Sequence, residues 1–270
     1  SISASTNKIA ALVERRRGNH FSLSSRVQAM PGFKKIAHRG ASGQYPENTR
    51  LAFVKAIEAG VDMIELDCQM TQDGHVVVFH DERLTRTANA RGTVTSKTLE
   101  HLKQLDIGQW RKKAFKGERI LTLEEALECL AGNADLCLEI KSYPDSSPGI
   151  ELKILFIISH YDYLDRTIIS SFNDNVLARV RELAPEATLG IIVGAKSAND
   201  PFESARRLGA KSIHVQKEIV SREFLSLAWE DGLDVHVWTV NELREMESFM
   251  ALGVQGLISD FPDKFAKLRC

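Results

Sequence analysis

Apolar and polar positions alternate in two recurring patterns from Lys35 onward. Short apolar runs rich in Val, Ile and Leu, typical of strands, occur at 35–38, 61–68, 75–80, 135–141, 167–171, 187–193, 211–215, 234–240 and 255–259. Segments with apolar residues at helical spacing lie between most of them, at 49–59, 122–130, 149–160, 173–184, 200–208, 221–231 and 241–252. Repeated strand-then-helix units with short connections predict a parallel sheet.

The nine strand-like runs are one more than an eight-stranded barrel requires. The dipeptide Asp73-Gly74 separates the second run from the third, and Asp-Gly between strands is typical of a two-residue hairpin turn. With that turn, Gln72 pairs with His75. Counting outward then places Asp67 opposite His80, with both side chains on one face. The third run is therefore an antiparallel excursion, and the other eight predict a (β/α)8 TIM barrel, an α/β fold.

Two segments fall outside this repeat. Residues 82–121 are long for a loop and follow His80, so we expect a small insertion after strand two that covers the barrel mouth as a partial lid. Residues 1–34 are interpreted as a basic N-terminal arm appended to a barrel domain at 35–270. Residues 1–35 carry seven basic groups and one acid, a charge of +6, which leaves −7 for the other 235 residues. A targeting peptide or a membrane-touching basic patch fits this arm as well.

Composition narrows the class of protein. A chain of 270 residues with 43% hydrophobic content can bury one large core, and its net charge of −1 does not favour a nucleic-acid partner. The four cysteines show neither zinc spacing nor a paired secretory pattern. No signal peptide is visible, and no apolar run approaches the ~18 residues of a membrane span. We therefore expect a reduced, cytoplasmic protein without stable membrane insertion.

Three carboxylates are expected at the inner ends of barrel strands: Glu65, Asp67 and Glu139. Each alone reads as an ordinary charged residue at a strand end. Buried carboxylates that converge repel one another unless a cation offsets them, so the group predicts a bound divalent ion. Because all the ligands are oxygens, Mg²⁺ or Ca²⁺ is favoured over zinc.

Two histidines and two cations accompany these carboxylates. His38 ends the first strand and His80 ends the hairpin return, and two imidazoles at one rim are best interpreted as an acid/base pair. Arg39 and Lys141 are expected to contact a phosphate, Arg39 through two hydrogen bonds and Lys141 as a point charge. The other six histidines are interpreted as ordinary core or surface residues.

Trp238 ends a late strand at the expected mouth. It is equally consistent with barrel packing and with a wall for the organic part of a substrate, and Phe172 has the same ambiguity. No glycine-rich nucleotide fingerprint follows any strand.

Seven motifs together resemble those of the glycerophosphodiester phosphodiesterase family. They appear in the family's order within residues 35 to about 265: His38-Arg39-Gly40, Pro46-Glu47-Asn48-Thr49, Glu65-Leu66-Asp67, His80-Asp81, Glu139-Ile140-Lys141, Trp238-Thr239-Val240-Asn241 and Ser259-Asp260-Phe261-Pro262. The resemblance implies a TIM barrel with a small insertion after strand two. It also implies metal-dependent hydrolysis of glycerophosphodiesters, such as glycerophosphocholine or glycerophosphoethanolamine, to glycerol 3-phosphate and an alcohol.

The resemblance also implies roles for individual residues. The three carboxylates would hold the metal, the two histidines would serve as general acid and base, and Arg39 and Lys141 would grip the phosphate. Glu47 and Asn48 would support the site. The sequence leaves open which histidine is the acid, which ion is bound and which headgroup is preferred. It also leaves open whether the glycerol 2-hydroxyl or water attacks the phosphorus.

Two other functions are weighed against this one. A lysophospholipase D would act on lysolipids through the same site, and a wide apolar mouth lined from 82–121 would favour it. A non-catalytic barrel that binds phosphate or lipid headgroups would predict loss of carboxylates or histidines, and all five are present. The oligomeric state is not indicated.

Overall fold

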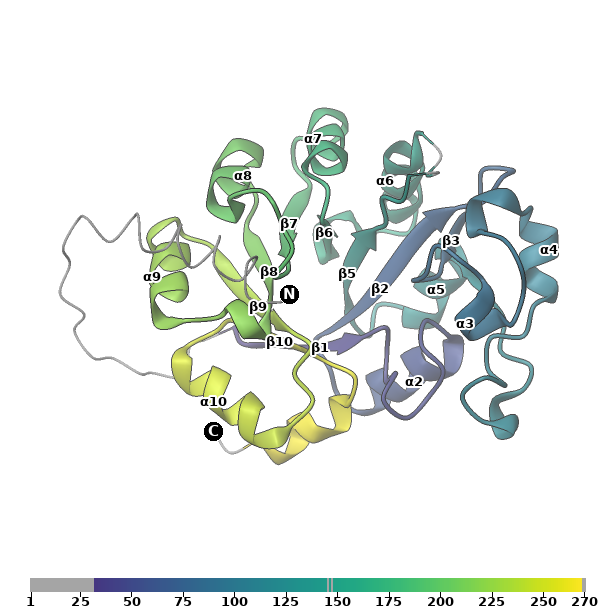
Figure 1. The fold of residues 1–270 in the computed structure, drawn as a ribbon, viewed down its shortest axis with the longest axis horizontal. Coiled ribbons are helices and arrows are strands. Elements are labelled where there is room, and N and C mark those ends of the chain that lie inside the picture. Colours follow the sequence, from purple (N-terminus) through teal and green to yellow (C-terminus); the bar gives the residue numbers. More distant parts are fainter. Residues whose placement is uncertain (1–31, 145, 147, 269–270) are drawn as a thin grey trace.

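The computed structural model describes residues 32–144, 146 and 148–268, and within them eight parallel strands form a closed barrel (Figure 1). The barrel strands are β1 (Lys34–His38), β2 (Met63–Met70), β5 (Asp135–Ile140), β6 (Thr167–Ser171), β7 (Thr188–Val193), β8 (Ser212–Gln216), β9 (Asp234–Trp238) and β10 (Gly256–Ser259). β1 pairs with both β10 and β2, which closes the ring. The predicted (β/α)8 TIM barrel is confirmed.

Helices cover the outside of the barrel (Figure 1). They are α2 (Arg50–Glu58), α5 (Leu123–Leu130), α6 (Ile150–His160), α7 (Asp174–Leu183), α8 (Pro201–Leu208), α9 (Arg222–Glu230) and α10 (Leu243–Leu252). Their bounds lie within two residues of the predicted ones. A capping box begins α5, because Glu125 N donates to Thr122 Oγ1 and Thr122 N donates to the Glu125 carboxylate.

The hairpin after β2 exists, but its predicted register is wrong by one residue. β3 (Val76–Val78) pairs antiparallel with β2 so that Cys68 faces Val78. The loop has three residues, because Thr71 N donates to His75 O at 2.9 Å and Gly74 adopts φ +82°. Asp73 stabilises this longer turn by accepting hydrogen bonds from Thr71 Oγ1 and Leu99 N. A three-residue loop with a left-handed glycine is the next most common hairpin after the two-residue one.

The shifted register changes how His80 reaches the site. Asp67 lies opposite Phe79, whose N–H donates to Asp67 O at 2.9 Å and whose side chain packs into the insertion. His80 follows the last ladder bond, so strand alternation does not fix its direction. Tyr143 Oη donates to His80 O at 2.5 Å and holds the backbone where the chain leaves the sheet.

The insertion 82–121 has a small core of its own. It contains α3 (Thr85–Ala88) and α4 (Leu99–Gln104), and its apolar residues pack with Val77 and Phe79 of the hairpin. It ends in a short strand, β4 (Leu121–Thr122), which pairs with β3 and which the sequence did not reveal. In Figure 1 it lies to one side of the barrel beside β3, and its role as a lid stays a prediction.

Most of the proposed basic arm, residues 1–31, lies outside the described residues. In the described part of the chain, Cys68 and Cys137 are buried free thiols. None of the described helices combines the length and apolar character needed to cross a bilayer.

Candidate active site

The alternation of the barrel strands positions the site. The floor of the barrel interior is a small apolar cluster of Ile36, Met63, Cys137 and Ile258. Two residues after each of these four apolar residues, the side chain again points to the inside of the barrel, but at its carboxyl end. The residues at these positions are His38, Glu65, Glu139 and Asp260. Apolar residues therefore close the barrel below, and polar groups meet above them.

The three predicted metal carboxylates lie together. Asp67 on β2 is the register partner of Glu139 on β5, and Glu65 precedes Asp67 by two residues. All three are buried, and one oxygen from each lies within 4.8 Å of the others. Asn48 fixes Asp67 by donating from Nδ2 to Oδ2 at 2.9 Å.

Lys141 and Arg39 partly compensate this negative charge. Lys141 Nζ lies 2.9 Å from Asp67 Oδ1 and 2.7 Å from Glu139 Oε1, and Arg39 Nε lies 3.3 Å from Asp67 Oδ2. Burial alone would raise the pKa of Asp67, but these two cations outweigh it and hold the pKa well below its ordinary value. Burial and then the charge of Asp67 raise the pKa of Glu65 well above its ordinary value. Three carboxylates against two cations leave one negative charge, so the donor set fits a hard divalent ion.

His38 is held by a carboxylate that the sequence did not single out. Its Nδ1 lies 2.6 Å from Asp260 Oδ1, and Asp260 also accepts from Asn241 Nδ2 at 2.7 Å and from Ser42 Oγ at 3.0 Å. When Nδ1–H donates to the Asp260 carboxylate, the other ring nitrogen, Nε2, carries no proton; it faces the site and lies 4.0 Å from Glu65 Oε2.

His80 is held in the same way on the other side of the site. Its Nδ1 lies 2.7 Å from Asp81 Oδ1, and Arg86 of the insertion binds both oxygens of Asp81 at 2.6 and 2.9 Å. Arg86 also binds both oxygens of Glu47 at 2.7 Å, and Glu47 accepts from Arg39 Nη1 at 2.9 Å. A chain of alternating charges thus connects one histidine to the arginine beside the carboxylates.

These groups surround one cavity of about 190 Å³. It is lined by Phe172 and by seven of the predicted site residues; the seven are His38, Arg39, Glu65, His80, Glu139, Lys141 and Trp238. Glu47 and Asn48 stand behind it and contact Arg39 and Asp67. Asp67 does not line the cavity but contacts Lys141 and Asn48, so the structure brings the predicted residues to one place.

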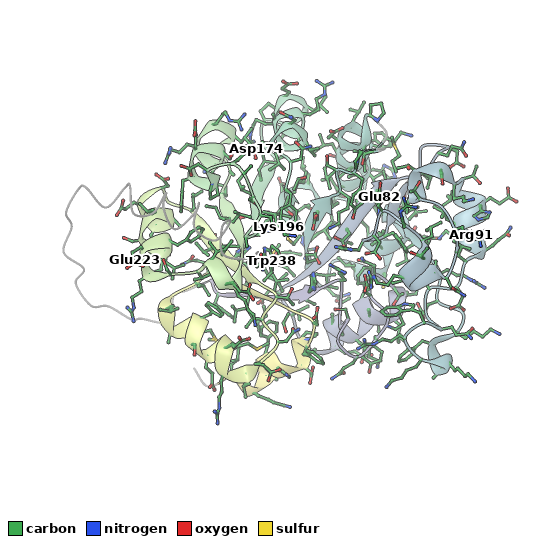
Figure 2. The ribbon with its side chains drawn as sticks, viewed as in Figure 1. Glu82, Arg91, Asp174, Lys196, Glu223 and Trp238 are labelled. Atoms are coloured by element: carbon green, nitrogen blue, oxygen red, sulfur yellow. The ribbon has the colours of Figure 1, made fainter. Side chains whose placement is uncertain are left out.

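A larger and mainly apolar cavity of about 750 Å³ adjoins the first and shares Phe172, Ile192 and Trp238 with it. The rings of Phe172 and Trp238 meet edge to face with centroids 6.0 Å apart. Lys196 and Asp174 also line this cavity (Figure 2). The Asp174 carboxylate is occupied by Ser204 Oγ at 2.5 Å and Arg207 Nη2 at 2.6 Å.

Residues 38–264 match the model of the glycerophosphoryl diester phosphodiesterase family. The chain belongs to this family. Like the named members it resembles, it is a phosphoric diester hydrolase.

Relatives of this glycerophosphodiester phosphodiesterase include an enzyme of that name from Caldanaerobacter subterraneus, 41% identical over 235 residues, or 86% of this chain and 96% of the relative. A Bacillus subtilis protein described as a putative glycerophosphodiester phosphodiesterase is 38% identical over 236 residues, with the same coverage. A solved Oleispira antarctica phosphodiesterase, in complex with its product sn-glycerol-3-phosphate, is 30% identical and superposes with a TM-score of 0.77. That match covers 86% of this chain and 94% of the Oleispira chain.

Three contributors to the site, Asp81, Asp260 and Arg86, are not evident from the amino-acid sequence. Asp81 and Asp260 stood inside the quoted motifs, but nothing in their spacing indicates that each binds a histidine. Arg86 lies in the insertion, where it looks like one of many surface charges. The Glu47–Arg86–Asp81 contacts join segments that are remote in sequence, so only the fold reveals them.

Proposed function

We propose that this chain hydrolyses glycerophosphodiesters to glycerol 3-phosphate and an alcohol, with one bound Mg²⁺ or Ca²⁺ and with His38 and His80 as general acid and base. The observation that carries the proposal is the pair of histidines, each held at Nδ1 by its own aspartate, on a cavity with buried carboxylates. The product described in the Oleispira relative supports the choice of substrate.

Glu65, Asp67 and Glu139 would hold the ion. When bound, a divalent cation neutralises phosphate oxygens and stabilises negative charge that develops in the transition state. Arg39 and Lys141 line the same cavity and add two fixed positive charges for the phosphodiester.

The two histidines would move the protons. Asp260 and Asp81 form hydrogen bonds with the Nδ1 atoms of His38 and His80, so each Nε2 is free to exchange a proton with substrate. One Nε2 removes the proton of the attacking hydroxyl as the O–P bond forms. The other Nε2 donates a proton to the leaving alkoxide as its P–O bond breaks. The attacking hydroxyl is either water or the substrate's own glycerol 2-hydroxyl; in the second case water opens a cyclic phosphate afterwards.

A panel of glycerophosphodiesters assayed with EDTA, and after readdition of Mg²⁺ or Ca²⁺, tests the proposal. We expect release of glycerol 3-phosphate to stop in EDTA and to return with one of the two ions. The same panel ranks the headgroups. Full turnover of every substrate in EDTA would contradict metal dependence.

Lysophospholipase D activity is a second candidate, because the adjoining apolar cavity of about 750 Å³ has room for hydrocarbon. It is lined from the β6 to β9 side of the barrel rather than from 82–121. Turnover of a lysophospholipid and of its deacylated counterpart, measured side by side, distinguishes the two activities. A Phe172→Ala variant should lose acylated substrate selectively if the cavity holds the chain.

A further inference from the structure

Residues 106–119 of the insertion, here termed the basic rim loop, concentrate positive charge. They contain five basic and two acidic residues, a charge of +3, whereas the whole chain carries −1 and the other 256 residues therefore carry −4. Lys112, Lys113 and Lys116 are exposed. In the described part of the chain, none of the three has an ion-pair partner.

The loop is built to hold its shape. The Asp106 carboxylate accepts hydrogen bonds from Gly108 N at 3.0 Å, Gln109 N at 2.8 Å and Gly117 N at 2.6 Å. Ile107 N donates to Glu118 O at 3.0 Å and closes the base of the loop. The Asp106 carboxylate is therefore occupied by the loop's own backbone, and within the described residues neither Asp106 nor Glu118 forms an ion pair with the three exposed lysines.

Two contacts fix the loop beside the mouth of the barrel. The Arg111 guanidinium donates to Gly43 O, in the loop that follows β1 and that begins with Arg39. The Phe115 ring packs against Tyr45 of that loop, with centroids 5.8 Å apart. In Figure 1 the basic rim loop projects at the lower right, next to α2. It therefore stands at the edge of the face that carries the catalytic cavity.

Trp110 adds an exposed aromatic group to this edge. Its side chain is 37% exposed, with its indole N–H bonded to Ile107 O and Arg86 over its ring at 5.6 Å. Indole rings beside lysines are typical of protein surfaces that meet the headgroup region of a bilayer.

We propose that the basic rim loop binds an anionic lipid surface, with Lys112, Lys113 and Lys116 among the headgroups and Trp110 at the interface. Each lysine at an anionic bilayer strengthens binding roughly fivefold, so three give a weak and reversible attachment. The net negative charge of the rest of the chain disfavours a long polyanion such as RNA, which would need contacts beyond this loop. Attachment here would place the mouth of the barrel close to the lipid. The proposal does not depend on the proposed function.

Vesicle sedimentation of the full chain tests this. We expect binding to vesicles of equal parts phosphatidylcholine and phosphatidylglycerol, little binding to phosphatidylcholine alone, and release by salt. The double variant Lys112→Glu/Lys116→Glu should bind the anionic vesicles at least roughly tenfold more weakly. The control Lys211→Glu/Arg222→Glu makes the same change in net charge at exposed positions by β8 and α9 and should bind normally.

Both variants keep residues 1–35, so binding by that segment cannot separate them. Turnover of a water-soluble glycerophosphodiester without vesicles should match the unmodified chain in both, which verifies folding. Equal weakening of the two variants would overturn the proposal. So would failure of the unmodified chain to bind anionic vesicles, or a preference for single-stranded RNA that the loop variant abolishes.

Discussion

At the scale of single residues, two aspartates hold the two histidines that line the small cavity. Asp260 and Asp81 each lie within 2.7 Å of an imidazole Nδ1, so they fix the ring orientation and favour a free Nε2 toward the cavity. Each aspartate is in turn held by other groups, Asn241 and Ser42 on one side and Arg86 on the other.

Alanine variants of the two histidines should separate their roles. His38→Ala and His80→Ala should each lower kcat with a choline or ethanolamine leaving group roughly 10²–10⁴-fold. With 4-nitrophenol as the leaving alcohol, which departs without protonation, only the variant that lacks the acid should recover. Steady-state rates on both substrates measure this. Near-normal turnover of glycerophosphocholine by either variant would refute the assignment of His38 and His80 as an acid/base pair.

Replacing Asp260 should impair His38 without removing it. Asp260→Asn removes the charge that stabilises a protonated His38, and we expect kcat/KM to fall about 10–100-fold, as for other buried partners that orient histidines. Asp263→Asn is the matched control, because within the described residues the one hydrogen bond of that carboxylate comes from Gln44 Nε2 at 3.3 Å. Equal rates for Asp260→Asn and the control would contradict the proposed role of Asp260 in orienting and stabilising His38.

At the scale of elements, the hairpin shows what a sequence pattern can and cannot settle. The strand and helix periodicities placed every barrel strand, and the convergence of Glu65, Asp67 and Glu139 followed from strand alternation. The register after β2 did not follow, because Asp73 side-chain bonds favour a three-residue loop over the two-residue turn typical of Asp-Gly. His80 still reaches the cavity, but through the chain's exit from the sheet and its bond to Tyr143.

The insertion should influence catalysis through Arg86. Arg86→Gln breaks the four hydrogen bonds to Glu47 and Asp81, and we expect kcat to fall roughly tenfold or more because charged hydrogen bonds are lost. Arg86→Lys keeps the positive charge but lacks the guanidinium group that binds two carboxylates at once, so it should recover part of the rate. Parallel thermal melts separate this effect from unfolding. If kcat of Arg86→Gln is unchanged, the network has no catalytic role.

At the scale of the whole molecule, the barrel interior also buries two histidines that have no role in the proposed chemistry, although one of them, His214, lines the smaller cavity. The rings of His214 and His236 lie 4.9 Å apart. Burial, and then the charge of Lys34, lower the pKa of His236 to about 4, and burial likewise lowers that of His214. The folded barrel therefore favours neutral imidazoles at these positions.

This burial predicts acid sensitivity. Between the ordinary histidine pKa of 6.5 and about 4, the unfolded chain binds a proton at His236 that the folded chain does not, so stability falls as the pH falls. His236 alone should reduce the free energy of unfolding by about 2 kcal/mol between pH 7 and pH 5. Urea unfolding at both pH values, compared with His236→Gln, measures it. If the free energy of unfolding of the variant depends on pH as that of the unmodified chain does, burial of His236 is not the cause of the acid sensitivity.

The proposed hydrolysis depends on a divalent ion at the three buried carboxylates. The most direct measurement is release of glycerol 3-phosphate from glycerophosphocholine by metal-stripped protein, as Mg²⁺ or Ca²⁺ is titrated back. We expect no release of glycerol 3-phosphate before an ion is added and a saturable return of activity with one of the two ions. In Glu139→Gln we expect no return of activity. Full activity in the stripped protein, or normal activity in Glu139→Gln, would contradict it.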